Sequence, residues 1–341
     1  MALQFGLDTF GDLTEDQNGA MLTHAQSIRN IVEQAVLAEE VGLDFIGIGE
    51  HHRADFAVSS PEMVLAAIAS RTSRIRLGSA VTVLSSDDPV RVFERFATLD
   101  ALSNGRAEVI LGRGSFTESF PLFGFDLADY NQLFEEKIEL FAELLKEKPV
   151  TWTGETRSAL SEQSVYPPTE SGSITTWVGV GGSPESVVRA AHYGFPLMLA
   201  IIGGDPLRFA PYVDLYKRAL GQFERGELPV AAHSPGHVAA SDEQAREELW
   251  PHFKANRDRI GQERGWPPMS REEYEREASE GALFVGSPET VAAKIVRAVE
   301  GLGLARFDLK YSNGTMPHET LMNSIALFGR EVAPLVRERL G

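Results

Sequence analysis

The chain has 341 residues, enough for one large α/β barrel or for two ordinary domains, and 43% of them are hydrophobic. Its 32 basic and 49 acidic residues give a formal net charge of −17, a field that repels nucleic acid and acidic membranes. Cysteine is absent, which excludes disulfides, thiolate metal sites and a cysteine nucleophile. The opening segment lacks the features of a signal peptide and no apolar run reaches membrane-spanning length. We therefore expect a cytoplasmic protein with neither nucleic-acid nor membrane partners.

Short apolar runs alternate with helical patterns along the whole chain. The first half predicts four strands and four helices, at 3–8, 26–41, 43–48, 61–71, 75–81, 89–102, 107–112 and 130–147. The second half predicts the same alternation, at 174–180, 184–194, 196–201, 206–224, 229–237, 242–261, 305–311 and 318–338. The strands are almost continuously apolar, which is typical of parallel strands covered by helices.

Eight such units predict an α/β fold, a (β/α)8 TIM barrel with insertions, over an open doubly wound sheet. We expect one domain over 1–341 with insertions at about 113–129, 148–173 and 255–282. The second insertion is read as a small β excursion. The third is highly charged and forms either a mobile lid or a surface loop. In this fold, chemistry lies where the strands run out into their following loops.

One acid and two imidazoles, Glu50, His51 and His52, follow the second strand and should therefore lie on that working face. A neutral imidazole can act as a base or a donor near neutral pH, and a nearby carboxylate can orient it. Because adjacent side chains diverge, we expect a functional role for one histidine and a structural role for the other. Neither HxH nor HExxH spacing is present, so we expect no metal site.

The end of the fifth strand carries groups that suit a phosphate. Gly181, Gly182, Ser183, Pro184 and Ser186 join the fifth strand to its helix, where glycines permit close approach and helix N–H groups attract anions. The same cap recurs at 286–289, which we interpret as plain helix capping.

Other strand ends offer a guanidinium, small residues and rings. Arg113 follows the fourth strand between two glycines and is either a phosphate ligand or the partner of a nearby acid. Ser79 and Ala80 end the third strand and would let a flat ring approach the backbone, or would serve close packing. Further candidates for the pocket lining are His233 and His237, beside an irregular strand end expected at Pro235, and three rings for which ordinary packing is favoured: Phe10, Phe116 and Phe120.

Taken in order, these segments resemble the bacterial luciferase-like flavin monooxygenase family. The resemblance runs from "FGLDTFG" to "SIALFGREVAPLV" and includes "GIGEHH", "VILGRG" and "VGVGGSPESVVRAA". It implies a TIM barrel in which His51 matches the catalytic imidazole. It also implies that Ala80 and Val81 match a non-proline cis peptide against the flavin ring. Residues that match the phosphate cluster are Arg113, Gly182, Ser183 and Ser186.

The resemblance further implies a flavin-dependent monooxygenase that oxygenates a small organic substrate with reduced FMN and O₂. A separate flavin reductase would supply the reduced FMN, and a homodimer is expected. Where luciferases carry a reactive cysteine this chain has Gly112, so light emission from a long aldehyde is not expected. Two alternatives stay open: a deazaflavin-dependent reductase or dehydrogenase of the same fold, and a non-catalytic flavin-binding protein.

Overall fold

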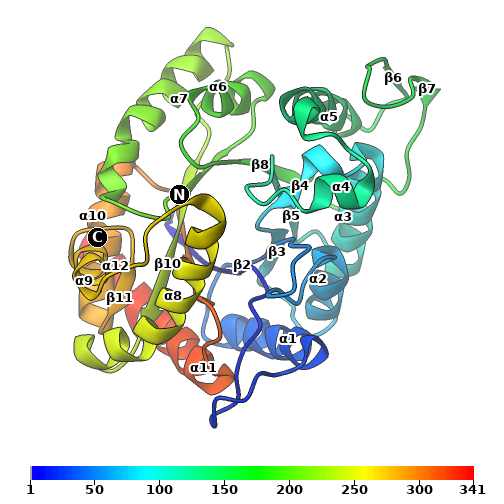
Figure 1. Ribbon diagram of the computed structural model, residues 1–341. Coiled ribbons are helices and arrows are strands. Elements are labelled where there is room, and N and C mark those ends of the chain that lie inside the picture. The colour runs from blue at the N-terminus through cyan, green and yellow to red at the C-terminus, as the bar shows by residue number, and fades with distance from the viewer. Residues whose placement is uncertain (1) are drawn as a thin grey trace.

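Eight parallel strands close into a barrel, which confirms the predicted (β/α)8 fold (Figure 1). In the computed structural model, which describes residues 2–341, the ring closes because the last strand pairs with the first. In order around the ring the strands are β1 (Gln4–Thr9), β2 (Phe45–Ile48), β3 (Arg76–Ser79), β5 (Ala107–Gly112), β8 (Thr175–Val180), β9 (Leu197–Ala200), β10 (Val230–Val238) and β12 (Arg306–Lys310).

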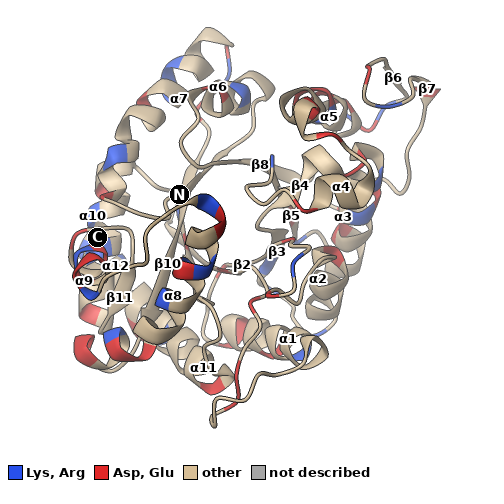
Figure 2. Ribbon diagram, viewed as in Figure 1, with Lys and Arg blue, Asp and Glu red and all other residues tan. Residues whose placement is uncertain are grey.

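Helices surround this ring, most of them close to their predicted positions, whereas α10 was anticipated only through its cap at 286–289 (Figure 1). They are α1 (His24–Glu40), α2 (Pro61–Ala69), α3 (Pro89–Ser103), α5 (Tyr130–Leu144), α6 (Pro184–Tyr193), α7 (Ala210–Gln222), α8 (Asp242–Arg264), α10 (Pro288–Leu302), α11 (His318–Leu327) and α12 (Ala333–Leu340). Charged side chains lie mainly on these outer helices and loops, as Figure 2 shows. Within residues 2–341, none of the helices combines the length and the hydropathy needed to cross a membrane.

The three insertions fold in different ways. The first holds the short helix α4 (Ser119–Phe123) and a 3₁₀ turn, Leu127–Asp129. The second forms the antiparallel hairpin of β6 (Val150–Trp152) and β7 (Leu160–Gln163), which confirms the predicted β excursion.

The third insertion, at 255–282, is mainly helical, which overturns the surface-loop alternative and leaves the lid alternative a prediction. Helix α8 continues to Arg264, and α9 (Arg271–Ser279) follows, capped by the hydroxyl of Ser270. Opposite charges four residues apart, such as Arg271 and Glu275, favour the helix over this stretch. A dense charge pattern without apolar periodicity had hidden it.

Strand β10 runs straight through Pro235, which corrects the expectation of an irregular strand end there. Pro235 lies opposite Lys310 of β12, and the strand then continues by pairing with β11 (Phe284–Gly286). The cap after β11 behaves as predicted, because the hydroxyl of Ser287 accepts the N–H of Thr290 at the start of α10.

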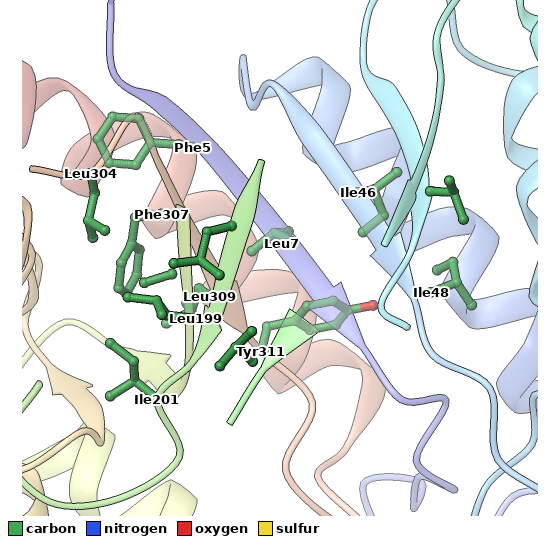
Figure 3. Packing of buried hydrophobic residues seen from close by; sticks show 14 of the residues in the cluster. Phe5, Leu7, Ile46, Ile48, Leu199, Ile201, Leu304, Phe307, Leu309 and Tyr311 are labelled. Carbon is green, nitrogen blue, oxygen red and sulfur yellow. The ribbon is translucent and has the colours of Figure 1, made fainter. Parts of the chain in front are cut away.

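Apolar side chains alternate along the strands between two cores. The larger core lies between the barrel and its helices, and Figure 3 shows members of it from several strands, among them Leu7, Ile46, Leu199 and Leu309. The smaller core fills the inside of the barrel and consists of Phe45, Ile110, Trp177, Met198 and Ala231, with Val81 packed against it.

A buried ion pair sits on this inner core. Arg306 is fully buried; its Nη1 lies 2.7 Å from Oε2 of Glu108, and its guanidinium lies 4.0 Å from the ring centre of Phe45. Burial alone would raise the pKa of Glu108, but the charges of Arg306 and Arg76 hold it below its ordinary value. The barrel interior therefore holds charged groups beside the apolar inner core.

Replacing Arg306 with methionine should destabilise the protein strongly, because Glu108 and Asp308 would lose their buried countercharge. We expect a loss of about 3–5 kcal/mol in the free energy of unfolding, measured by urea denaturation. The matched control is Arg337→Met, which removes a half-exposed partner of Asp44 and should cost no more than about 1 kcal/mol. Equal losses in the two variants would contradict this account.

Candidate active site

Because all eight barrel strands run in one direction, their carboxyl ends meet on one rim, the mouth of the barrel. His51 lies on this rim inside an aromatic cage. The centre of its ring is 4.3 Å from that of Phe56, 4.9 Å from that of Phe10 and 5.1 Å from that of Phe116. Phe10 and Phe116, for which ordinary packing was the favoured interpretation, both take part in this cage. Phe120 is instead fully buried and stacks on Tyr130.

The cage holds His51 uncharged. Burial, reinforced by the charge of Lys310, lowers the pKa of His51 to about 3. Its Nε2 is buried and has no hydrogen-bond partner within residues 2–341. A neutral ring with a free nitrogen can donate or accept one hydrogen bond, but it cannot provide a cation near neutral pH.

The carboxylate of Glu50 orients His52, not His51. Its Oε1 lies 3.0 Å from Nε2 of His52, while its Oε2 accepts the backbone N–H of Val83 at 2.9 Å. Glu50 therefore joins the end of β2 to the segment after β3. The adjacent side chains of His51 and His52 diverge as expected. Glu50 therefore forms its hydrogen bond with His52 and not with the caged His51.

The peptide bond between Ala80 and Val81 is cis, as the family resemblance implies. Both residues are only partly buried, and the Val81 side chain packs against the inner core. A Cβ atom at Gly112 would overlap the side chain of Val81, and one at Gly49 would crowd the carbonyl of Ala80. Glycines at the ends of β2 and β5, the strands on either side of β3, thus make room for this segment. By contrast, Ser79 is fully buried and bonds to the backbone of Ile110.

Arg113 is on the same rim and carries an uncompensated charge. Within residues 2–341 it forms no ion pair; its Nη1 donates to the side chain of Asn131 at 3.3 Å and its guanidinium lies 5.5 Å from the ring centre of Tyr130. The alternative that Arg113 pairs with a nearby acid is therefore not what the structure shows. A partly exposed, unpaired guanidinium can bind an anion with two hydrogen bonds.

The loop after β8 is open on its glycine side. A Cβ atom at Gly181 would meet no atom within 4 Å, and Gly182 adopts φ +129°, a conformation that favours glycine. The hydroxyl of Ser183 caps α6 by accepting the N–H of Ser186, as predicted. The loop thus offers room for an anion beside the start of a helix.

Glu185 competes for this loop. Its Oε2 accepts the hydroxyl of Ser183 at 2.7 Å. That hydrogen bond, assisted by the charge of Arg113, lowers the pKa of Glu185. Arg113 is therefore close enough to act on the start of α6, where the exposed carboxylate of Glu185 lies.

The helix α8 ends over the mouth of the barrel. Its residue Glu263 binds Arg53, with Nη1 and Oε2 2.8 Å apart, and Arg53 also pairs with Glu118 after β5. The next helical residue, Arg264, lies over the ring of Phe116, 5.1 Å from its centre. These contacts, which we call the α8 clamp, connect the end of α8 to the loops after β2 and β5.

Sequence reasoning grouped His233 with His237, but the structure separates them. His237 is fully buried and its Nε2 lies 2.8 Å from Oε2 of Glu248 in α8, away from the aromatic cage. His233 lies inside the barrel against Asp8, which the sequence analysis missed. The signal available for Asp8 was a carboxylate near the end of an apolar first strand, a position where burial of a charge requires a partner.

A cavity of about 450 Å³ lies on the other side of the residues that follow β2. His52, Glu62, Arg95 and Lys137 are among the residues that line it, and His51 is not. Its charged walls pair with one another, as Arg95 does with Glu62 at 3.6 Å. Within residues 2–341, no three His, Asp or Glu side chains cluster as metal ligands would.

The sequence and the fold both resemble those of known proteins. The model of the family of luciferase-like monooxygenases matches residues 9–306. The 4-hydroxyprotoasukamycin monooxygenase of Streptomyces nodosus subsp. asukaensis is 28% identical over 320 residues, which cover 89% of this chain and 85% of that protein.

Two solved structures share the fold over almost their full length. The oxygenating constituent of 3,6-diketocamphane monooxygenase from Pseudomonas putida, in complex with FMN, has a TM-score of 0.79 at 19% identity and covers 98% of this chain and 99% of its own. An F420-dependent secondary alcohol dehydrogenase has a TM-score of 0.77 at 17% identity, with the same coverage.

His51 should make the stability of the protein fall in acid. Its pKa is about 3 when folded against 6.5 as an ordinary value, so below pH 6.5 the unfolded chain binds a proton that the folded protein does not. Its contribution is complete above pH 6.5 and is lost as the pH falls toward 3. Urea unfolding of His51→Gln between pH 6.5 and 4.5 should therefore show a shallower slope than wild type, by up to about 1.4 kcal/mol per pH unit.

The control for this measurement is His24→Gln, which changes an exposed histidine and should leave the slope as it is in the wild type. Identical slopes for His51→Gln and the wild type would show that the cage does not hold the ring neutral.

Proposed function

The chain belongs to the luciferase-like monooxygenase family, a family of oxidoreductases, and on this premise we propose that it uses reduced FMN and O₂ to insert one oxygen atom into a small organic substrate. A separate reductase would supply the reduced flavin. The observation that carries the proposal is the unpaired Arg113 beside the open Gly181–Gly182 loop, on the same rim as the cis Ala80–Val81 peptide and the caged His51.

The residues at the mouth fit a phosphorylated flavin. Arg113 would bind the phosphate together with the backbone of Gly182 and the hydroxyls of Ser183 and Ser186. The partly exposed segment Ala80–Val81 would contact the ring system, since the neighbouring strand ends are glycines. Glu185 would have to release Ser183, which costs little because the contact is exposed to solvent.

Bound reduced flavin would supply the electrons that activate O₂. The chain would contribute a dry, positioned environment for this chemistry. His51, neutral and with Nε2 free, would donate or accept one hydrogen bond at the reacting atoms. The aromatic cage and the α8 clamp would exclude water from the mouth.

A deazaflavin cofactor is the second candidate, favoured by the likeness to an F420-dependent dehydrogenase. The same loop and Arg113 would hold its phosphate, and the reaction would then be a hydride transfer without oxygen. A homodimer is retained from the family resemblance. Equilibrium titration of the protein with reduced FMN and with reduced F420 separates the two cofactors.

The direct test mixes the protein with photoreduced FMN and then with oxygen. We expect flavin oxidation that is slower than in free solution, because the site shields the cofactor from water, and a change in its rate in His51→Ala. Tighter binding of F420 with no effect on the oxidation of FMN would favour the deazaflavin enzyme. Flavin binding with no turnover of any substrate would favour a storage protein.

Two substitutions at the phosphate loop should act in opposite directions. Arg113→Met should weaken FMN binding by about 10- to 100-fold, because it removes a charge-assisted hydrogen bond. Glu185→Gln should tighten binding, since it removes the carboxylate that holds Ser183 and faces Arg113. Riboflavin, which lacks the phosphate, is the matched control ligand, and its affinity should not respond to either change. An unchanged FMN affinity in both variants would show that the phosphate binds elsewhere.

A further inference from the structure

A second imidazole, His233, lies inside the barrel and is oriented by a carboxylate. Its Nδ1 is 2.6 Å from Oδ2 of Asp8, and both side chains are almost completely buried, at 10% and 3% exposed. An ionised carboxylate can only accept a hydrogen bond, so beside Asp8 the neutral form of the imidazole carries its proton on Nδ1. The other nitrogen, Nε2, therefore presents its lone pair.

His233 lies at the same mouth of the barrel as His51. The ring of His233 stacks on Phe10, with centres 5.9 Å apart, and Phe10 in turn contacts His51 edge-on. Within residues 2–341, Nε2 of His233 makes no hydrogen bond and is not among the atoms sealed from solvent. The imidazoles of His51 and His233 thus both contact the ring of Phe10, but within residues 2–341 only that of His233 is hydrogen-bonded to a carboxylate.

The charges around His233 come from two strands. Asp8 is on β1, and β12 contributes Asp308, which lies opposite His233 in the sheet, together with Arg306 and Lys310. Burial raises the pKa of Asp308 to about 7 despite its contact with Arg306. The Nζ of Lys310 lies over the ring of Phe10, 4.6 Å from its centre. The carboxylate in contact with the imidazole is that of Asp8.

We propose that His233 is the general base of the mouth, that Asp8 positions it, and that the substrate is a planar molecule with an ionisable hydroxyl, a phenol or an enol. The proposal rests on the proposed function. The substrate O–H bond breaks, an N–H bond forms at Nε2, and the electron pair stays on the substrate oxygen. Asp8 stabilises the resulting imidazolium, which returns the proton to the product or to water.

The surroundings of the base fit this class of substrate. Phe10, Phe56 and Phe116 present ring faces and edges around the mouth, and aromatic rings pack well against a planar ligand. Deprotonation of a phenol or enol makes its ring or its α-carbon electron-rich, the state in which it accepts an oxygen atom from O₂ activated by a reduced flavin. His51, held neutral without an acid, is less suited to take that proton.

The test uses 4-nitrophenol and the protein without cofactor, because the absorbance of the bound probe reports its ionisation directly. Below the probe's own pKa, wild type should bind it largely as the coloured phenolate. His233→Gln and Asp8→Asn should each reduce the phenolate fraction by about 10-fold or more, equivalent to one pKa unit. Asp8→Asn preserves shape, so a purely structural role of Asp8 would leave the fraction unchanged.

The matched control is His237→Gln, on the same strand and in the same type of contact with a carboxylate, but facing α8. It should bind the probe as wild type does, and thermal unfolding should show that all three variants are folded. Equal phenolate fractions in wild type and His233→Gln, or no binding of the probe to wild type, would overturn the proposal.

A parallel measurement of reduced-FMN binding distinguishes a failure of the base assignment from a failure of the proposed function. If wild type binds flavin but the probe does not respond to His233→Gln, the base assignment alone fails. If wild type binds neither reduced FMN nor F420, the proposed function fails and the assignment of the base falls with it.

Discussion

Closure of a parallel sheet is the constraint on which the rest of the structure depends. The pairing of β12 with β1 and of β10 with β9 turns eight separate strands into a ring. Every carboxyl end must then lie on one rim. Residues as distant in sequence as His51 and Arg113 are brought to the same mouth for that reason, and the loops that follow the strands inherit their positions from it.

The ring also encloses charge. Arg306 and its acids lie beside the apolar inner core, and Asp8 with His233 lies in the same interior, against the ring of Phe10. Charges that are buried this deeply require partners, so each acid in the barrel is tied to a cation or an imidazole. The two imidazoles of the mouth differ as a result: one is caged by rings and held neutral, and the other is backed by a carboxylate.

Local patterns predicted the fold well because they depend on local physics. Apolar runs, a proline at the first helical position and serine caps place strands and helices without reference to distant residues, and Ser183 and Ser287 cap their helices as expected. Helix α9 of the third insertion was missed because charge pairs four residues apart, such as Arg271 and Glu275, stabilise it in place of an apolar face.

Side-chain partnerships could not be predicted in the same way. The pairing of Glu50 with His52, of Ser183 with Glu185 and of Asp8 with His233 depends on the direction in which each side chain leaves its backbone. For Asp8 and His233, 225 residues apart, it also depends on the order of strands in the ring. The cis bond at Ala80 was anticipated from the family resemblance and not from residue chemistry.

The most direct test of the central claim, that this rim holds one phosphorylated flavin, is a crystal structure of the protein with FMN. The account predicts the phosphate between Arg113 and the loop at 181–186, with the ring system against Ala80 and Val81. Flavin bound in the cavity beside Glu62 and Lys137, or a phosphate outside the reach of Arg113, would contradict it.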